Sequence, residues 1–214
     1  LRAPGWILGE DSKKMSKRWG NVVTPDDIVP KFGADTLRIY EMFMGPFDIM
    51  KPWSTSGVEG ASRFLGRVWR LVSTNVIDKS GSQVTIKLHQ TIKKVTEDIE
   101  NYRFNTAISA LMELVNVISA QGGAVKEIFK SFALLLAPFA PHLAEEVWVN
   151  VLGQKFSVHT SNWPKYNSKL LEVDEVVVII QVNGKVRGQL TVDSRQSTAK
   201  LEIEKLAKAD PKVI

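Results

Sequence analysis

The residues best suited to chemistry are cations near the start of the sequence. Lys14 and Lys17 lie three residues apart within the basic run Lys13–Arg18, and Gly9 and Gly20 allow the flanks to move. A loop of this kind can fold over a triphosphate and place ammonium groups on its oxygens. Charge on a leaving pyrophosphate is then neutralised where it develops. From charge spacing alone, an ordinary solvated surface loop is the alternative.

Three arginines further along the chain could contact a polyanion. Arg63, Arg67 and Arg70 repeat at helical spacing and share one face, which is typical of a track for backbone phosphates. Glu59 lies four residues before Arg63. An ordinary surface ion pair is therefore the alternative for that arginine.

Lys185 and Arg187 flank the tip of a predicted hairpin at Asn183-Gly184, and strand alternation directs both to the same side, where they could contact a polyanion or be solvated strand charges. Other polar and aromatic residues are expected to be structural. They are His142 as a helix-start residue, Arg38 as an ion-pair partner of nearby acids, Asp26 and Asp27 as partners of a helix dipole, and Trp53, Trp69 and Trp148 as packing residues.

Composition limits the class of protein. The 214 residues carry a net charge of +5 and a pI of about 9.3, which weakly favours a polyanionic partner. There is no cysteine, so thiolate metal sites are excluded and a cytoplasmic setting is expected, and the three scattered histidines suggest no metal site. The longest apolar run, 132–140, contains Pro138 and is shorter than the roughly 18 residues of a membrane span, so no membrane contact is expected.

The first region, residues 1–55, must present the lysine-rich loop. It is rich in glycine, proline and charge, which indicates short elements joined by turns. The expected elements are strands at Trp6–Gly9 and Asn21–Val23, a helix that follows Thr24 as its N-cap and stops near Gly33, and a helix over Asp35–Met44.

The second region, residues 56–152, carries a helical period. Apolar residues repeat at steps of three and four, which predicts an antiparallel bundle of four or five helices. A break is expected near Arg103–Asn105, an end at Gly122-Gly123, and a division of the last two helices near Pro138 and Pro141. The predicted core stripes are Val58, Ala61, Leu65, Val68 and Val72, then Leu88, Ile92, Val95, Ile99 and Tyr102, then Ile108, Leu111, Val115 and Ile118.

The third region, residues 163–214, is predicted to be a small α+β domain. Two β-branched runs, Glu175–Val182 and Gln189–Val192, indicate a hairpin, and Thr198 begins a helix. The fold class is therefore mainly α, with a helical bundle between a loop-bearing junction and a small α+β domain. Because Leu1 is not an initiator Met and the last domain looks truncated, a fragment of a longer chain is expected.

An ordered series of strings resembles one family. The segment Lys14–Asn21 is similar to the KMSKS loop of class I aminoacyl-tRNA synthetases, and Pro25–Asp27 and Phe32–Arg38 follow at the distances usual for that class. The later strings resemble the leucine-specific members rather than the valine or isoleucine ones. Those strings are Met44–Pro46, Trp53–Gly57, Arg63–Leu71, Ala137–Glu146 and Gln181–Arg187. The resemblance covers nearly the whole chain.

The resemblance implies a parent enzyme that activates leucine with ATP, in the presence of Mg, and transfers it to tRNA(Leu). Lys17 matches the lysine that binds ATP phosphates, while Lys14 and Ser16 match the loop's first lysine and serine. The bundle resembles the anticodon-binding domain, which grips the tRNA body, and the last region resembles a small tRNA-binding domain. A monomer is expected. By itself this piece is expected to hold no cofactor and to have no synthetase activity.

One departure from the family pattern lies inside the loop. Arg18 stands where the family has a final serine, and Trp19 adds bulk beside it. Either the loop docks differently, or Arg18 supplies another phosphate contact. Two other interpretations of the excised piece stay open: a stand-alone RNA-binding module, and a structural helical scaffold.

Overall fold

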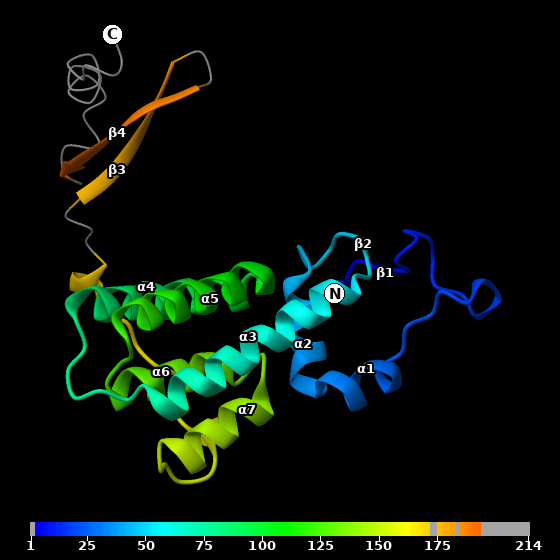
Figure 1. Cartoon of the computed structure of the whole chain (residues 1–214), viewed down its shortest axis with the longest axis horizontal. Helices are drawn as coiled ribbons and strands as arrows, with labels where there is room; N and C mark the ends of the chain where they lie inside the picture. Colours follow the sequence, from blue (N-terminus) through cyan, green and yellow to red (C-terminus); the bar gives the residue numbers. More distant parts are fainter. Residues whose placement is uncertain (1–2, 172–174, 183–184, 194–214) are drawn as a thin grey trace. The chain divides into compact units, whose positions relative to one another are not determined.

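The computed structural model describes residues 3–171 in full and, beyond them, the backbone of two strands at 175–182 and 185–193. Contacts divide the chain into two compact units, Leu1–Tyr166 and Asn167–Ile214. The described part of the first unit contains the helices α1 to α7 (Figure 1). No helix in the described ranges is long and apolar enough to cross a membrane.

The first region contains two short strands, each of two residues, that pair with one another. β1 (Ile7–Leu8) pairs in parallel with β2 (Lys51–Pro52), through the hydrogen bonds Lys51 N–H to Trp6 C=O at 3.1 Å and Trp53 N–H to Leu8 C=O at 2.8 Å. The strand predicted at Asn21–Val23 is wrong. The partner of β1 comes from a segment more distant in sequence, which local alternation cannot reveal.

The next two helices follow their predicted boundaries. α1 (Pro25–Phe32) starts after Thr24, whose N–H and hydroxyl both donate to Asp27 Oδ2 at 2.9 and 2.7 Å. Gly33 ends α1 with φ at 87°, a backbone conformation that glycine adopts without strain. α2 (Ala34–Phe43) then runs to the turn before Pro46, within one residue of the prediction.

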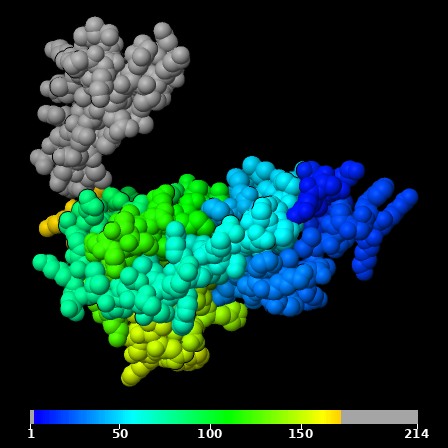
Figure 2. All heavy atoms as spheres, viewed as in Figure 1, coloured from blue at the N-terminus to red at the C-terminus, as the bar shows by residue number. Residues whose placement is uncertain are grey.

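The predicted bundle is confirmed. α4 and α5 lie side by side as a hairpin joined by a short turn, α3 and α6 pack against this hairpin, and α7 packs against α6 and α2 (Figure 1). Figure 2 shows α3, in cyan, running along the visible face of the first unit. The bounds are α3 Thr55–Thr74, α4 Ser82–Glu100, α5 Phe104–Gln121, α6 Lys126–Leu136 and α7 Pro141–Glu146, which continues into a π-helical turn at Val147–Val151.

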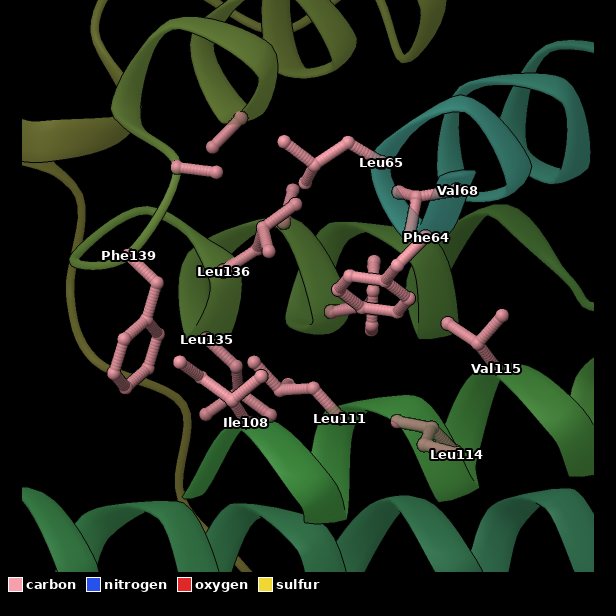
Figure 3. Close-up of a cluster of buried hydrophobic side chains, with 14 of the residues drawn as sticks. Phe64, Leu65, Val68, Ile108, Leu111, Leu114, Val115, Leu135, Leu136 and Phe139 are labelled. Atoms are coloured by element: carbon pink, nitrogen blue, oxygen red, sulfur yellow. The ribbon is translucent and has the colours of Figure 1, made fainter. Parts of the chain in front are cut away.

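The core lies where the helices meet (Figure 3). All predicted stripe residues of α3 and α5 are buried, and each fully buried large aliphatic side chain contributes about 1.5–3 kcal/mol. Tyr102 is the exception to the α4 stripe, because α4 ends at Glu100 and Tyr102 adopts a left-handed φ of 58° in the turn. Figure 3 shows side chains of α3, α5 and α6 converging, among them Phe64, Leu65, Val68, Ile108, Leu111, Leu114, Val115, Leu135 and Leu136.

Two polar side chains of α2 hold the corner between α6 and α7. The buried carboxylate of Asp35 accepts hydrogen bonds from the Leu143 N–H at 2.7 Å and the His142 ring Nδ1 at 2.8 Å. Arg38 donates to the carbonyls of Pro138 at 2.7 Å and Phe139 at 3.2 Å. Among the described residues Arg38 has no acid within 4.0 Å, although its charge partly offsets the burial that raises the pKa of nearby Glu41. Its hydrogen bonds go instead to carbonyls beyond the end of α6 that need donors.

The second unit contains a short 3-10 turn (Ser168–Leu170) and an antiparallel hairpin of β3 (Glu175–Val182) and β4 (Lys185–Asp193). The hairpin confirms the predicted pairing, although β4 begins four residues earlier than the predicted Gln189. The predicted turn at Asn183-Gly184 and the helix from Thr198 lie outside the described residues.

Candidate functional site

The lysine loop, residues Lys14–Asn21, projects from the first unit between β1 and α1 (Figures 1 and 2, blue). A tight turn precedes it. The Ser12 N–H donates to the Gly9 carbonyl at 2.9 Å, and the Gly9 N–H donates to the Lys13 carbonyl at 2.8 Å. This reversal brings Lys14 back alongside Leu8 in an isolated antiparallel bridge. The turn and this bridge therefore anchor the start of the lysine loop against β1.

Within the loop, a single 3-10 turn over Lys17–Trp19 presents the second lysine. Ser16 caps this turn, because its hydroxyl accepts the Arg18 N–H at 3.3 Å and its carbonyl accepts the Trp19 N–H at 3.0 Å. Gly20 closes the turn with φ at 65°. Ser16 is half-buried, and its hydroxyl serves the backbone of the turn.

The cationic side chains of the loop face solvent. The Lys14 ammonium lies 4.3 Å from the centre of the Trp6 ring, and the Arg18 guanidinium lies 5.4 Å from that of Trp19. Among the described residues, no carboxylate lies within 4.0 Å of Lys14 or Lys17. Lys17 is therefore exposed and available to an anionic ligand.

A polar contact closes the base of the loop; we call it the Asp11–Asn21 clasp. The Asn21 amide oxygen accepts the Ser16 N–H at 2.9 Å, while its nitrogen donates to Asp11 Oδ1 at 3.1 Å and to the Lys14 carbonyl at 3.4 Å. Asp11 Oδ1 also accepts the Lys13 N–H at 3.1 Å. These bonds, from Asn21 first and then from Lys13, lower the pKa of Asp11 below its ordinary 3.8.

The loop is also tied to the start of the bundle. The Glu10 carboxylate accepts the Thr55 N–H at 2.9 Å and the Thr55 hydroxyl at 2.7 Å, and these two bonds lower the pKa of Glu10. Thr55 is the first residue of α3, where a carboxylate satisfies free N–H groups and the helix dipole. Nearby, the Tyr40 hydroxyl accepts the Ser54 N–H at 2.7 Å.

Sequence reasoning missed Glu10, Asp11 and Asn21 as site residues. Each is a common polar residue, and nothing in the local sequence marks it as a contact of the loop. Only the folded chain brings Asn21 back to Asp11, ten positions away, and Glu10 to Thr55, 45 positions away. The one local signal was the string itself, in which Asn21 follows the glycine that ends the loop.

The three arginines of α3 share one surface, as predicted. They line a groove of about 440 Å³ together with Gly60, Phe64, Gly66 and Met112 of α5. Arg63 lies 3.8 Å from Glu59. That distance, and the exposure of both side chains, make a weak pair. Arg67 lines the groove and buries its Nε without a hydrogen-bond partner in the described structure.

The structure changes the interpretation of Lys185 and Arg187. Ile180 pairs with Gly188 and Gln181 pairs with Val186, so Arg187 is the extra residue of a β-bulge. A bulge interrupts the alternation of a strand. The prediction that both residues point to one side therefore loses its basis, and their side chains lie outside the described structure.

The remaining candidates occupy structural positions. Trp53 and Trp148 are 5% and 8% exposed, as expected for packing residues, whereas Trp69 is half-exposed at 37%. His142 stands at the start of α7 with its ring against Asp35, as predicted for a helix-start residue. Asp26 and Asp27 both lie in the first turn of α1, where the Asp27 carboxylate accepts a hydrogen bond from the Thr24 N–H.

Comparisons with known proteins address the class of the chain. Residues 83–204, more than half of the chain, match the family "Anticodon-binding domain of tRNA ligase", and residues 2–47 match "tRNA synthetases class I (I, L, M and V)". The second match covers the lysine loop, and the first covers most of the helical bundle that follows it. The fold and the site therefore define a segment of a class I tRNA synthetase.

Individual relatives narrow this class. The leucine–tRNA ligases of Leptospira biflexa serovar Patoc, strains Patoc 1 / Ames and Patoc 1 / ATCC 23582 / Paris, are 49% identical over 192 residues, 86% of this chain. The agnB2 LeuRS of Agrobacterium radiobacter K84, solved as a ternary complex with tRNA and LeuAMS, matches 98% of the chain with a TM-score of 0.76 and 31% identity.

The chain belongs to the family of tRNA ligase anticodon-binding domains, and over most of its length it is similar to leucine–tRNA ligases. It spans 22% of the length of the two Leptospira relatives and 30% of the LeuRS chain in the ternary complex.

Proposed function

We propose that the chain is the lysine-loop and tRNA-binding part of a leucine–tRNA ligase, an enzyme that activates leucine with ATP and transfers it to tRNA(Leu). The observation that carries the proposal is the exposed, unpaired Lys17 on a loop tied to the first bundle helix. The identity of 49% to leucine–tRNA ligases supports leucine as the amino acid.

In this proposal the cations of the loop act on ATP phosphates. The Lys17 ammonium binds phosphate oxygens and offsets the charge that develops on pyrophosphate as it leaves. Lys14 and Ser16 contribute further contacts. Lys14 must leave the Trp6 ring to do so, and an exposed cation–π contact contributes only about 0.5–1 kcal/mol. A phosphate oxyanion is therefore the stronger partner.

The described residues contain no cluster of metal ligands. In the described ranges, no group of three or more Asp, Glu or His side chains could hold a metal ion. Magnesium in the ligase is thus assigned no ligand here, and no step is derived through it. The role of the chain toward ATP rests on its own cations.

We further propose a division of labour along the chain. Residues 1–55 are the loop and junction of the catalytic domain, 56–152 the anticodon-binding-type bundle, and 163–214 a small C-terminal domain. The arginine groove of α3 is proposed to contact tRNA phosphates, and Lys185 and Arg187 are proposed as further tRNA contacts. The ligase is proposed to be a cytoplasmic monomer.

The main test changes Lys17 in the ligase that carries this chain. Lys17→Ala is expected to lower the rate of ATP–pyrophosphate exchange by about 100-fold, the loss typical of one preorganised contact to developing charge. Leucine and tRNA binding should change little. Lys31→Ala, which removes an exposed lysine of α1, is the matched control. An exchange rate that is unchanged in Lys17→Ala excludes the proposed role.

The departure at position 18 has its own test. If Arg18 supplies a phosphate contact, Arg18→Ser raises the KM for ATP in the exchange reaction because one cation is lost. If the arginine only stacks beside Trp19, the same change leaves the KM for ATP where it was. The KM for ATP of Arg18→Ser therefore distinguishes a phosphate contact from simple stacking.

The arginine groove is tested by the salt dependence of tRNA binding. Each phosphate contact contributes roughly 0.7–0.9 to the slope of log K against log salt. Replacing Arg63, Arg67 and Arg70 together by Gln should therefore make the slope shallower by about 2–3. A slope equal to that of the unchanged protein would remove this face from the tRNA interface.

A further inference from the structure

The Asp11–Asn21 clasp joins the two ends of the lysine loop. Asp11 precedes the loop and Asn21 is its last residue, and the contact between them spans ten positions. Inside this ring, Asn21 also holds the Ser16 N–H at 2.9 Å and the Lys14 carbonyl at 3.4 Å. One amide side chain therefore fixes the backbone next to both lysines.

The chemistry of the clasp requires an amide at position 21. The Asn21 oxygen accepts a hydrogen bond while its nitrogen donates two, and among side chains of this length only an amide does both. An alanine makes neither kind of bond. An aspartate keeps the acceptor for the Ser16 N–H, but places a second carboxylate beside Asp11, where the present distance is 3.1 Å.

Gly9 shows that space is reserved for the clasp. A Cβ at position 9 would lie 2.7 Å from Asp11 Oδ1 and 2.8 Å from Asn21 Nδ2, closer than real Cβ atoms approach other atoms. Gly9 is buried, so the chain cannot move away cheaply. The absence of a side chain at Gly9 and the polar pair at the base of the loop are therefore parts of one arrangement.

We propose that Asp11 and Asn21 are positioning residues, which hold the lysine loop in the conformation that offers Lys17 to ATP. This inference rests on the proposed function of the loop. Neither residue needs to touch ATP. When the clasp is lost, the loop samples more conformations and only a fraction of the molecules present Lys17 correctly.

This role predicts a particular kinetic pattern. The lysine contact strengthens as charge develops on the leaving group, so a poorly held loop lowers kcat for exchange more than it raises the KM for ATP. Binding of leucine is unaffected, because the clasp lies in the ATP loop. Loss of the clasp is expected to lower kcat by about tenfold, which corresponds to a barrier higher by about 1.4 kcal/mol.

The decisive experiment is a double-mutant cycle on the two side chains in the ligase that carries this chain. Asn21→Ala and Asp11→Ala each remove the contact between the two side chains, and each should lower kcat by about tenfold. The double variant Asp11→Ala/Asn21→Ala should be little slower than either single variant, because the shared contact is lost only once. Non-additivity of this kind shows coupling between the two positions, which two independent losses do not give.

A second measurement uses the chain itself and needs no activity. Trypsin cuts after Lys14, Lys17 and Arg18, and it cuts faster when a loop opens. Asn21→Ala should raise the cleavage rate in the loop by about tenfold if one clasp-breaking change releases it. The control is Asn116→Ala, which removes an exposed asparagine from α5 and should leave cleavage of the loop unchanged.

The outcomes separate this inference from the proposed function. If Lys17→Ala is defective in exchange but both single clasp variants are normal, or if the losses of the two single variants multiply in the double variant, the positioning role is overturned and the ATP role stands. Normal exchange by Lys17→Ala overturns both. Unchanged cleavage in Asn21→Ala also contradicts the inference, whatever the kinetics.

Discussion

Asp98 offers the sharpest test of what holds the bundle together. Its carboxylate is fully buried near the end of α4, where it accepts hydrogen bonds from the Lys94 ammonium at 2.9 Å and the Thr106 hydroxyl at 2.6 Å and pairs with Arg103 Nε at 2.9 Å. These partners come from both sides of the turn between α4 and α5. Asp98→Ala therefore removes the acceptor that holds this turn.

The expected loss of stability follows from these contacts. Hydrogen bonds to a charged group contribute about 1.5–3 kcal/mol each. The Lys94 and Arg103 side chains are 47% and 53% exposed, so water replaces part of what they lose. We expect a loss of about 3 kcal/mol, the lower end of the range for breaking a buried ion pair. For a domain of this size, that lowers the Tm by about 6–12 °C.

The assay is urea and thermal unfolding followed by circular dichroism at neutral pH. Glu97→Ala is the matched control. Glu97 is the neighbouring acid, half-exposed, and lies 3.9 Å from Lys93, so its loss should cost less than about 0.5 kcal/mol. If the two variants differ by less than about 1 kcal/mol, the three contacts of Asp98 do not stabilise the fold as argued.

Three further predictions concern packing and pH. Leu111→Ala, at a fully buried position of α5, should cost about 2–5 kcal/mol in urea unfolding, and a smaller loss would mean that the core collapses around the cavity. In α3, a Cβ at Gly66 meets open space, so Gly66→Ala should raise the free energy of unfolding by about 0.5–1 kcal/mol. A Cβ at Gly57 would lie 2.6 Å from the Tyr40 ring, so Gly57→Ala should lower the free energy of unfolding. Equal effects of the two variants would contradict this packing. Burial lowers the pKa of His89 below its ordinary 6.5, so just below pH 6.5 the unfolded chain binds more protons than the folded one. The free energy of unfolding therefore falls as the pH drops through this window. His89→Gln should flatten the plot of unfolding free energy against pH.

The helices were predictable because their signals are local. The spacing of Val58, Leu65 and Val72 predicts the buried face of α3, and Thr24 and Gly33 predict the ends of α1. Tyr102 shows the limit of this reasoning. Its spacing continues the α4 stripe, but the chain has already turned, held by the Arg103 N–H on the Asp98 carbonyl at 2.7 Å.

Partnerships across the chain were not predictable in the same way. Arg38 was expected to pair with an acid of its own helix, yet it donates to carbonyls about 100 positions away. The strand expected at Asn21–Val23 does not form, because β1 pairs with residues near position 51 instead. In both cases the choice depends on which elements pack together, and helical or strand periodicity carries no information about that.

For this protein, the sequence by itself determined the cations of the lysine loop and the apolar period of the bundle, since both are properties of residue type and spacing. Tertiary structure alone decided how the loop is held. The Asp11–Asn21 clasp forms because the chain turns back on itself between these residues, and the contact of Glu10 with Thr55 forms because β1, β2 and the start of α3 meet. A hydrogen bond needs its two groups within about 3 Å, and folding brings them there.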